Sequence, residues 1–254
     1  MLFYPPEYAK DMSIRFTYHS TGIEGNRLTV GEVTHVLLHH SIMTVQSRSL
    51  REIYEVDNHI AAFHHLFSEA ASKRKLDVPL LLDFHHDLTK NTMTSPGEFK
   101  QSSNQILGAN FETASPGMAP ILAKQWCDNL NYQLDTAKNE SEVLTSLLDS
   151  HIKFEQMHPF EDGNGRTGRL LINFELAKRE MPFLIIERDD RDEYLQYMSA
   201  TNVPALVKYA EGKMAKEKER YDSYLVNYKR QQEFEQQQRQ KMNFPPRKPK
   251  QRER

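Results

Sequence analysis

The stretch His158-Pro-Phe-Glu-Asp-Gly-Asn-Gly-Arg-Thr-Gly-Arg169 determines how the rest of this sequence is interpreted. Its compact turn, Gly163-Asn-Gly165, has little side-chain bulk and runs directly into residues that we expect to form a helix. Backbone N–H groups in such a turn can approach an anion closely, and a helix N-terminus adds further free N–H groups and partial positive charge. The stretch therefore predicts an anion-binding turn at the start of a helix.

The side chains of the same stretch suit phosphoryl or nucleotidyl transfer. Histidine is the side chain that titrates near neutral pH, so His158 can take a proton from a hydroxyl group. Asp162 offers hard oxygen ligands for Mg²⁺, which commonly binds carboxylates together with substrate phosphates. Arg166 and Arg169 are three residues apart, on one face of the expected helix, and each can bind phosphate through paired hydrogen bonds.

Two other interpretations of these residues fail on spacing. An EF-hand loop that begins at Asp162 would need glycine at position 167 and glutamate at position 173, where the chain has Thr167 and Asn173. A P-loop would need the pattern GxxxxGK[ST], which the sequence lacks. A purely structural turn would require neither the preceding histidine nor the two aligned arginines.

The chain around this stretch has mostly helical periodicity, with only 10 glycines in 254 residues. Thr29–Glu32 and Ser49–Glu52 match the capping box and predict two helix starts. His151 lies two turns before His158 and is expected to pack beneath the site. Further helices are predicted over residues 78–91, 117–135, 141–157, 166–180, 189–200 and 204–238. Residues 94–116, bounded by Ser-Pro-Gly and Ala-Ser-Pro, predict a loop or a small β-hairpin on a mainly α protein.

Composition limits the class of protein. The chain has 33 basic and 35 acidic residues and a net charge of −2, so nucleic acid is not expected as a partner. A lone cysteine, Cys127, excludes an internal disulfide framework. The first residues lack the pattern of a secretory signal, and no apolar run approaches the roughly 20 residues that span a bilayer. We therefore expect a cytoplasmic protein with no membrane contact.

The end of the chain differs in charge from the rest. Residues 241–254 contain six basic side chains and one acidic side chain, so they carry +5 and residues 1–240 carry −7. Such charge runs are usually solvated, which predicts a fraying helix with a disordered end. The alternative is a basic arm for nucleic acid or another acidic partner.

The stretch from His158 to Arg169 resembles the signature of the Fic/Doc family, HPFx(D/E)GNGRxxR, at every specified position. The resemblance covers roughly residues 1–212. It implies a Fic-fold helical bundle with a small β-hairpin flap beside the active site. It also divides the chain into an N-terminal segment with an inhibitory helix at residues 1–30, a catalytic core at 31–212 and a charged helical or disordered tail at 213–254.

This resemblance implies a Mg-ATP-dependent protein adenylyltransferase that moves AMP from ATP to Ser, Thr or Tyr hydroxyls of target proteins and of itself. His158 would deprotonate the hydroxyl, Asp162 would hold Mg²⁺, and Asn164 with the neighbouring amides would stabilise the α-phosphate. Arg166 and Arg169 would hold the β- and γ-phosphates. The nucleotide-binding residues would be Asp162, Gly163, Asn164, Gly165, Arg166, Thr167, Gly168 and Arg169 of the signature, Gln105, Ile106, Leu107 and Gly108 of the flap, and Tyr194 and Asn202 on the adenosine side.

A second motif, Ser20-Thr-Gly-Ile-Glu24-Gly25-Asn26, resembles the inhibitory pattern (S/T)xxxE(G/N) of autoinhibited family members. Ser20 and Glu24 are four residues apart and share one face of a short helix, which Gly25 and Asn26 would cap. By resemblance, Glu24 would pair with Arg169 and remove a ligand of the γ-phosphate.

Three functions stay open on the sequence alone. The first is the autoinhibited adenylyltransferase, with ATP and an unidentified hydroxyl-bearing protein as partners. The second is an enzyme of the same fold that transfers UMP, GMP, phosphate or phosphocholine, or that mainly removes AMP. The third is a nucleotide-binding module without turnover. Whether the chain forms a homo-oligomer also stays open.

Overall fold

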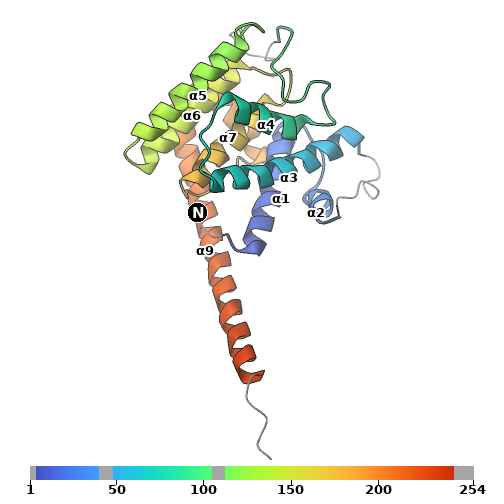
Figure 1. Cartoon of the computed structure of the whole chain (residues 1–254), viewed down its shortest axis with the longest axis vertical. Coiled ribbons are helices and arrows are strands. Elements are labelled where there is room, and N and C mark those ends of the chain that lie inside the picture. Colours follow the sequence, from blue (N-terminus) through green and yellow to red (C-terminus); the bar gives the residue numbers. More distant parts are fainter. Residues whose placement is uncertain (1–3, 40–47, 105–111, 243–254) are drawn as a thin grey trace, which may run out of the picture.

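A computed structural model of the chain describes residues 4–39, 48–104 and 112–242, with side chains up to residue 238. Within these residues the fold is a bundle of helices (Figure 1). The elements are α1 (Pro6–Ile23), α2 (Val30–His39), α3 (Leu50–Ala71), α4 (Val78–Thr89), α5 (Ala119–Thr136), α6 (Glu140–Met157), α7 (Asn164–Lys178), the 3₁₀ helix η1 (Arg188–Asp190), α8 (Arg191–Ser199) and α9 (Val203–Met242).

The predicted helices are confirmed to within a few residues of their ends. Both capping boxes form. Ser49 and Glu52 exchange side-chain and backbone hydrogen bonds at the start of α3. The Thr29 N–H donates to Glu32 over 2.7 Å, and the Glu32 N–H donates to the Thr29 hydroxyl over 3.3 Å. The N-terminal helix is longer than the short helix expected from the inhibitory motif, because it begins at Pro6.

The predicted β-hairpin flap is not supported, because the described part of the chain contains no strand. The segments on either side of the flap are joined by a side-chain contact, in which the Thr113 hydroxyl donates to the Asn104 carbonyl over 2.7 Å. Their backbones bond to the stretch before the glycine turn. The Lys100 N–H donates to the Pro159 carbonyl over 3.0 Å, and the Ala114 N–H donates to the Met157 carbonyl over 3.1 Å. The predicted flap residues Gln105, Ile106, Leu107 and Gly108 lie outside the described residues.

Helix α7 lies at the centre of the bundle, against α1, α3, α4 and α6 (Figure 1). Thirteen of its 15 residues are buried, including both signature arginines and apolar residues such as Leu170 and Phe174. Because α7 is packed on all sides by other helices, its position in the core is fixed. The glycine turn leads directly into the N-terminus of this helix, so the core also fixes the position of the turn.

Helix α1 is part of this core. Phe16 packs against Phe63 of α3, with ring centroids 5.8 Å apart. A second contact joins α1 to α9. Glu217 of α9 accepts hydrogen bonds from the Tyr8 hydroxyl over 2.8 Å and from two Arg15 nitrogens over 2.8 and 2.7 Å. These contacts fix α1 against both α3 and α9.

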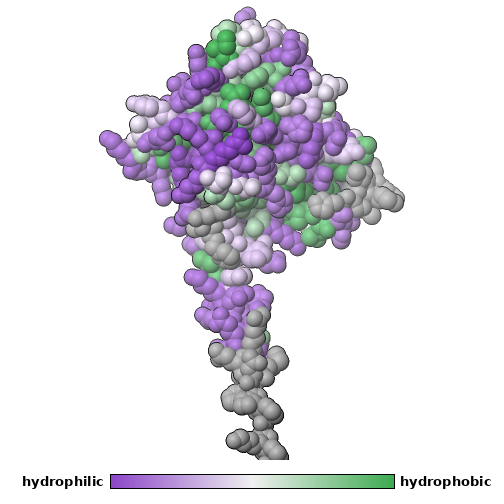
Figure 2. All heavy atoms as spheres, viewed as in Figure 1, coloured by the Kyte–Doolittle hydropathy of each residue, from purple (hydrophilic) through white to green (hydrophobic). Residues whose placement is uncertain are grey.

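Helix α9 joins the bundle along its first part and then projects from it (Figure 1). Met214 belongs to the main core and Glu217 is buried, so the packed part of the helix extends past the predicted boundary at residue 212. Figure 2 shows mostly hydrophilic side chains on the projecting part. No helix among the described residues combines the length and apolar character that a membrane crossing requires.

The Glu217 contacts predict a stability effect. Replacing Glu217 by alanine leaves Arg15 and Tyr8 largely buried without their acceptor, so we expect a loss of about 2–4 kcal/mol in the free energy of unfolding. Urea denaturation followed by circular dichroism measures this change. Glu219→Ala, an exposed position on the same helix, is the matched control. Equal unfolding free energies for the two variants would show that the buried contact does not stabilise the docking of α1.

Candidate active site

A cavity of about 410 Å³ lies where the end of α1, the end of α6, the start of α7 and helix α8 meet. One side is polar and includes His158, the glycine turn and Arg169. The other side is more apolar and includes Ile152, Leu195 and Met198. The complete lining is Glu24, Ile152, Glu155, Gln156, His158, Glu161, Asp162, Gly163, Asn164, Gly165, Arg169, Arg191, Tyr194, Leu195, Met198 and Ser199.

His158 is the residue that ends α6, with a left-handed backbone conformation at φ = 47°. Its Nδ1 lies 3.3 Å from the Glu155 carbonyl, which can only accept a hydrogen bond. Nδ1 therefore carries the proton, and Nε2 is left with a free lone pair. Burial lowers the pKa of the ring, against the opposing effect of the Glu155 carbonyl, so the ring is neutral at neutral pH. His158 is thus prepared to accept a proton at Nε2.

The glycine turn is fixed by His85 of α4. His85 Nδ1 accepts from the Gly97 N–H over 3.0 Å, so its Nε2 donates to the Asp162 carbonyl, also over 3.0 Å. Burial lowers the pKa of His85 to about 4, which keeps this tautomer uncharged. Gly163 has φ = 80°, and a Cβ there would lie 2.8 Å from a Thr89 methyl group. Glycine is thus required at Gly163 by both conformation and space.

The side chains of two residues that are predicted to contact nucleotide hold the turn together. The Asn164 amide accepts from the Phe160 N–H over 3.0 Å and donates to the Phe160 carbonyl over 2.9 Å. The Thr167 hydroxyl donates to the Gly163 carbonyl over 2.8 Å. With these side chains engaged and the Gly163 N–H donating to Asp162, the backbone N–H of Gly165 at the cavity is the group of the turn best placed for an anion.

Asp162 is the carboxylate at the (D/E) position of the signature, and its side chain is 46% exposed at the cavity. Its two oxygens accept from Arg51 of α3 and from the Gly163 N–H, each over 2.6 Å. Burial alone would raise the pKa of Asp162, but Arg166, the Gly163 N–H and Arg51 together lower it. The carboxylate is therefore ionised at neutral pH, as a Mg²⁺ ligand must be.

The two signature arginines separate. Arg166 is 2% exposed and turns toward α3, where its nitrogens lie 3.5 Å from Asp162 and 4.0 Å from Glu55. Among the described residues its Nε and Nη1 have no hydrogen-bond partner, and it does not line the cavity. Arg169 is 3% exposed and does line the cavity. Only Arg169 therefore presents its guanidinium to the cavity.

Arg169 is paired with the C-terminal end of α1. Its Nη2 donates to Glu24 Oε1 over 2.7 Å and to the Ser20 carbonyl over 2.8 Å, and its Nε donates to the Ser20 hydroxyl over 3.0 Å. A Cβ on Gly165 would lie 2.3 Å from Glu24 Oε1, so glycine at this position admits the carboxylate. Glu24 thus lies directly against the predicted phosphate-binding turn.

The end of α1 is held on two further sides. Gly25, at φ = 96°, reverses the chain, and Asn26 then donates to the Glu52 carbonyl and to Glu55 of α3 over 2.8 and 2.9 Å. From α8, Arg191 Nε donates to the Ile23 carbonyl over 2.8 Å. The backbone that carries Glu24 is therefore fixed between α3 and α8.

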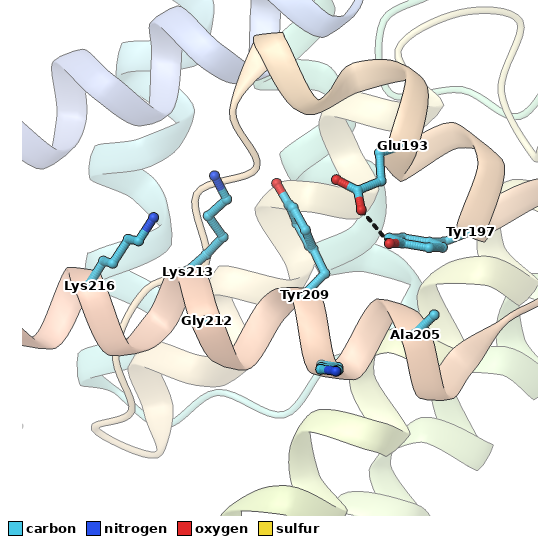
Figure 3. Close-up of a pocket in the computed structure, with 8 residues that line it drawn as sticks. Glu193, Tyr197, Ala205, Tyr209, Gly212, Lys213 and Lys216 are labelled. Carbon is cyan, nitrogen blue, oxygen red and sulfur yellow. Dashed lines mark hydrogen bonds between the residues drawn. The ribbon is translucent and has the colours of Figure 1, made fainter.

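Helix α9 in turn supports α8 through η1. Asp190 accepts from the Tyr209 hydroxyl over 2.9 Å and pairs with Lys213. Figure 3 shows Tyr209 and Lys213 pointing from α9 in the same direction, beside a second hollow whose other wall carries Glu193 and Tyr197 of α8. Glu193 and Tyr197 pair with each other, and Asp190 of η1 holds Tyr209 and Lys213, so α9 supports α8 through η1.

The predicted adenosine-side residues differ in position. Tyr194 lines the cavity, and its hydroxyl lies 2.6 Å from His151 Nε2. Asn202 does not line it. Its side chain accepts from the Ala205 N–H over 3.2 Å at the start of α9. His151 packs beneath the site as expected, since a Cβ on Gly168 would lie 2.6 Å from its ring.

Glu155 is a cavity residue that the sequence reasoning missed. Its Oε1 is buried and has no hydrogen-bond partner among the described residues. Burial, Glu24 and the weaker opposing effect of Arg169 together raise its pKa to about 8. The sequence signal that could have identified Glu155 is its carboxylate, one helical turn before His158.

The packing around Gly168 can be tested with two glycines on different helices. Gly168→Ala brings a methyl group into His151, so we expect a loss of about 1–3 kcal/mol in the free energy of unfolding. Gly212→Ala on α9 meets nothing within 4 Å, so we expect a gain of up to about 1 kcal/mol from helix propensity. Thermal or urea unfolding measures both. A gain for both variants would show that His151 does not pack tightly against α7.

Comparisons with known proteins agree with this geometry. Residues 75–176 match the model of the Fic/DOC family. Protein adenylyltransferase Fic from Drosophila willistoni is 28% identical over 194 residues, which cover 76% of this chain and 38% of that protein. The protein of the same name from Drosophila virilis is 29% identical, over 76% of this chain and 39% of that protein. This chain thus spans about two fifths of the length of these curated relatives.

Solved structures have the same architecture. A Fic-domain-containing signaling protein from Bacteroides thetaiotaomicron superposes with a TM-score of 0.75 at 25% identity, covering 84% of this chain and 89% of that one. Fic-1 from C. elegans superposes with a TM-score of 0.73 at 25% identity, covering 86% of this chain and 64% of that one. Taken with the signature and the glycine turn, these matches show that residues 75–176 form a Fic/DOC family domain.

Proposed function

We propose that this protein transfers AMP from ATP to a hydroxyl group of a target protein, and that Glu24 inhibits the transfer. The observation that carries the proposal is a single cavity lined by a neutral His158, the glycine turn and the buried cation Arg169. The name of the relatives, protein adenylyltransferase, supports the same reaction.

The reaction needs a base, a site for the α-phosphate and a site for the leaving group. The oxygen of a Ser, Thr or Tyr hydroxyl attacks the α-phosphorus, and its proton passes to His158 Nε2. The bond from the α-phosphorus to the oxygen that bridges to the β-phosphate breaks, and pyrophosphate leaves. The backbone N–H of Gly165 would stabilise the charge that develops on the α-phosphate. The Gly163 N–H could join it only after leaving Asp162, to which it now donates.

The residues present fit Mg²⁺ together with the substrate. The described residues include no cluster of three or more His, Cys, Asp or Glu side chains that could hold a metal ion. The ionised Asp162 at the cavity edge is a suitable single ligand, because Mg²⁺ usually completes its shell with phosphates and water. When bound, the ion would neutralise phosphate charge, while Arg51 would have to release the oxygen that it now contacts.

Inhibition follows from competition for one guanidinium. While Arg169 donates to Glu24 and Ser20, it cannot bind the end of a triphosphate. The Glu24 carboxylate also places negative charge where further phosphate charge would lie. ATP would then bind weakly or in an unproductive pose until Glu24 withdraws.

The inhibitory role is tested by Glu24→Gly. We expect AMP transfer to rise by about ten- to a hundredfold, because Arg169 becomes available. Incorporation of labelled AMP into a cell lysate and into the protein itself measures this, and mass spectrometry identifies the group transferred. Asp189→Gly, an exposed acidic residue of η1, is the charge-matched control. Unchanged incorporation in the Glu24→Gly protein would refute the inhibitory role.

The role of His158 is tested in the activated background. Adding His158→Ala to Glu24→Gly removes the base, so we expect AMP transfer to fall by about 10²- to 10⁴-fold while ATP still binds. Initial rates and calorimetric ATP titration separate the two effects. Full transfer activity without His158 would exclude it as the base, and ATP binding without any transfer in the Glu24→Gly protein would favour a nucleotide-binding module.

A further inference from the structure

A second carboxyl group, that of Glu155, lies in the cavity that Glu24 also lines. Glu155 belongs to the last turn of α6 and lines the cavity together with Glu24 and Arg169. The residue as a whole is partly buried, yet its Oε1 is shielded from solvent and makes no hydrogen bond within the described residues. A buried carboxyl oxygen without a partner is costly, so this position calls for a functional explanation.

Both carboxyl groups line the cavity with Arg169, and Glu24 is the one in ion-pair contact with it. The pKa of Glu155 is raised by burial and by Glu24, and Arg169 opposes both effects. Glu155 in turn contributes to the raised pKa of Arg169, in which Glu24 has the larger share and burial acts the other way. A like charge nearby disfavours ionisation, so Glu155 is protonated more readily than an ordinary glutamate while Glu24 holds the ion pair with Arg169.

The other groups that face Glu155 keep a fixed charge over the same pH range. Burial lowers the pKa of His151 to about 3 and raises that of Tyr194 above its usual value, so both are neutral. Gly168 of α7 leaves room for this cluster, because a Cβ there would lie 3.2 Å from Glu155 Oε1 and 2.6 Å from His151 Nδ1. Two further cavity residues come from other positions. The His158 ring is uncharged at and above neutral pH, and the Arg191 guanidinium stays positively charged.

We propose that Glu155 is a second competitor for Arg169, so that the guanidinium can bind a triphosphate only while Glu155 is protonated. When Glu24 withdraws and no nucleotide is bound, Glu155 loses its repelling neighbour and ionises more easily. The ionised carboxylate pairs with Arg169 and repels the triphosphate. Binding of a triphosphate then requires that Glu155 takes up a proton.

This inference rests on the proposed function, and it predicts the direction in which the affinity for a triphosphate changes with pH. A group that must be protonated in the complex weakens binding as the pH rises above its pKa in the free protein. In the Glu24→Gly protein the affinity for a triphosphate is therefore full at low pH and falls by about tenfold per pH unit above that pKa. AMP lacks the terminal phosphates that would contact Arg169, so its affinity does not follow this dependence.

The experiment measures binding instead of turnover. The α,β-methylene analogue of ATP, which cannot be cleaved at the α–β linkage, is titrated with Mg²⁺ into Glu24→Gly and Glu24→Gly/Glu155→Gln proteins between pH 7 and 9.5. Glutamine keeps the size of the side chain and cannot ionise, so the double variant should bind the analogue equally well at every pH. Glu24→Gly/Glu140→Gln, with an exposed change on the same helix, should keep the alkaline loss.

The outcomes separate this inference from the proposed function. Alkaline loss for the analogue in Glu24→Gly, its absence with Glu155→Gln, and pH-independent AMP binding would support the inference. A parallel alkaline loss in both proteins, or the same loss for AMP, would overturn it and leave the proposed function standing. Failure of the Glu24→Gly protein to bind the analogue at any pH would overturn both. The comparison of analogue with AMP in Glu24→Gly alone suffices if the double variant does not fold.

Discussion

The buried positive charge of Arg169 is the constraint on which the site depends. A guanidinium that is almost entirely removed from water must have an anionic or strongly polar partner at all times, because an unpaired buried charge costs several kcal/mol. Ser20 and Glu24 supply those partners from α1. In the function that we propose, the contact with Glu24 and the binding of a triphosphate are therefore two solutions to one electrostatic requirement, and each excludes the other.

Much of this arrangement is encoded locally. Helix positions follow from periodicity and from the capping boxes, whose side-chain bonds form as expected. The glycine turn was predictable because only glycine suits a left-handed residue with a threonine methyl group beside it. The meeting of Glu24 with Arg169, 145 residues apart, was expected only through the resemblance of both motifs to a family pattern.

Other features depend on packing that no local pattern reveals. Spacing puts Arg166 and Arg169 on one helix face, but their partners on α3 and α1 draw the two side chains apart. The resemblance also implied an adenosine contact for Asn202, whose side-chain oxygen caps the start of α9. The hairpin was predicted from turn residues, whereas the backbone donors of Lys100 and Ala114 bond to the stretch that precedes the turn. The environment of Glu155 depends on how α7 and α8 pack around the end of α6.

The docking of α1 has a consequence for how inhibition can be lost. This helix is tied to α9 by Glu217 and to α3 by Phe16 and Asn26, so it belongs to the same cooperative folding unit as the signature helix. Detachment of α1 as a separate subdomain is therefore not expected while the bundle stays folded. Under the proposed function, Glu24 would withdraw by rotamer changes of its side chain, because Asn26 and Arg191 hold the backbone on either side of it. Such motions take on the order of picoseconds to nanoseconds.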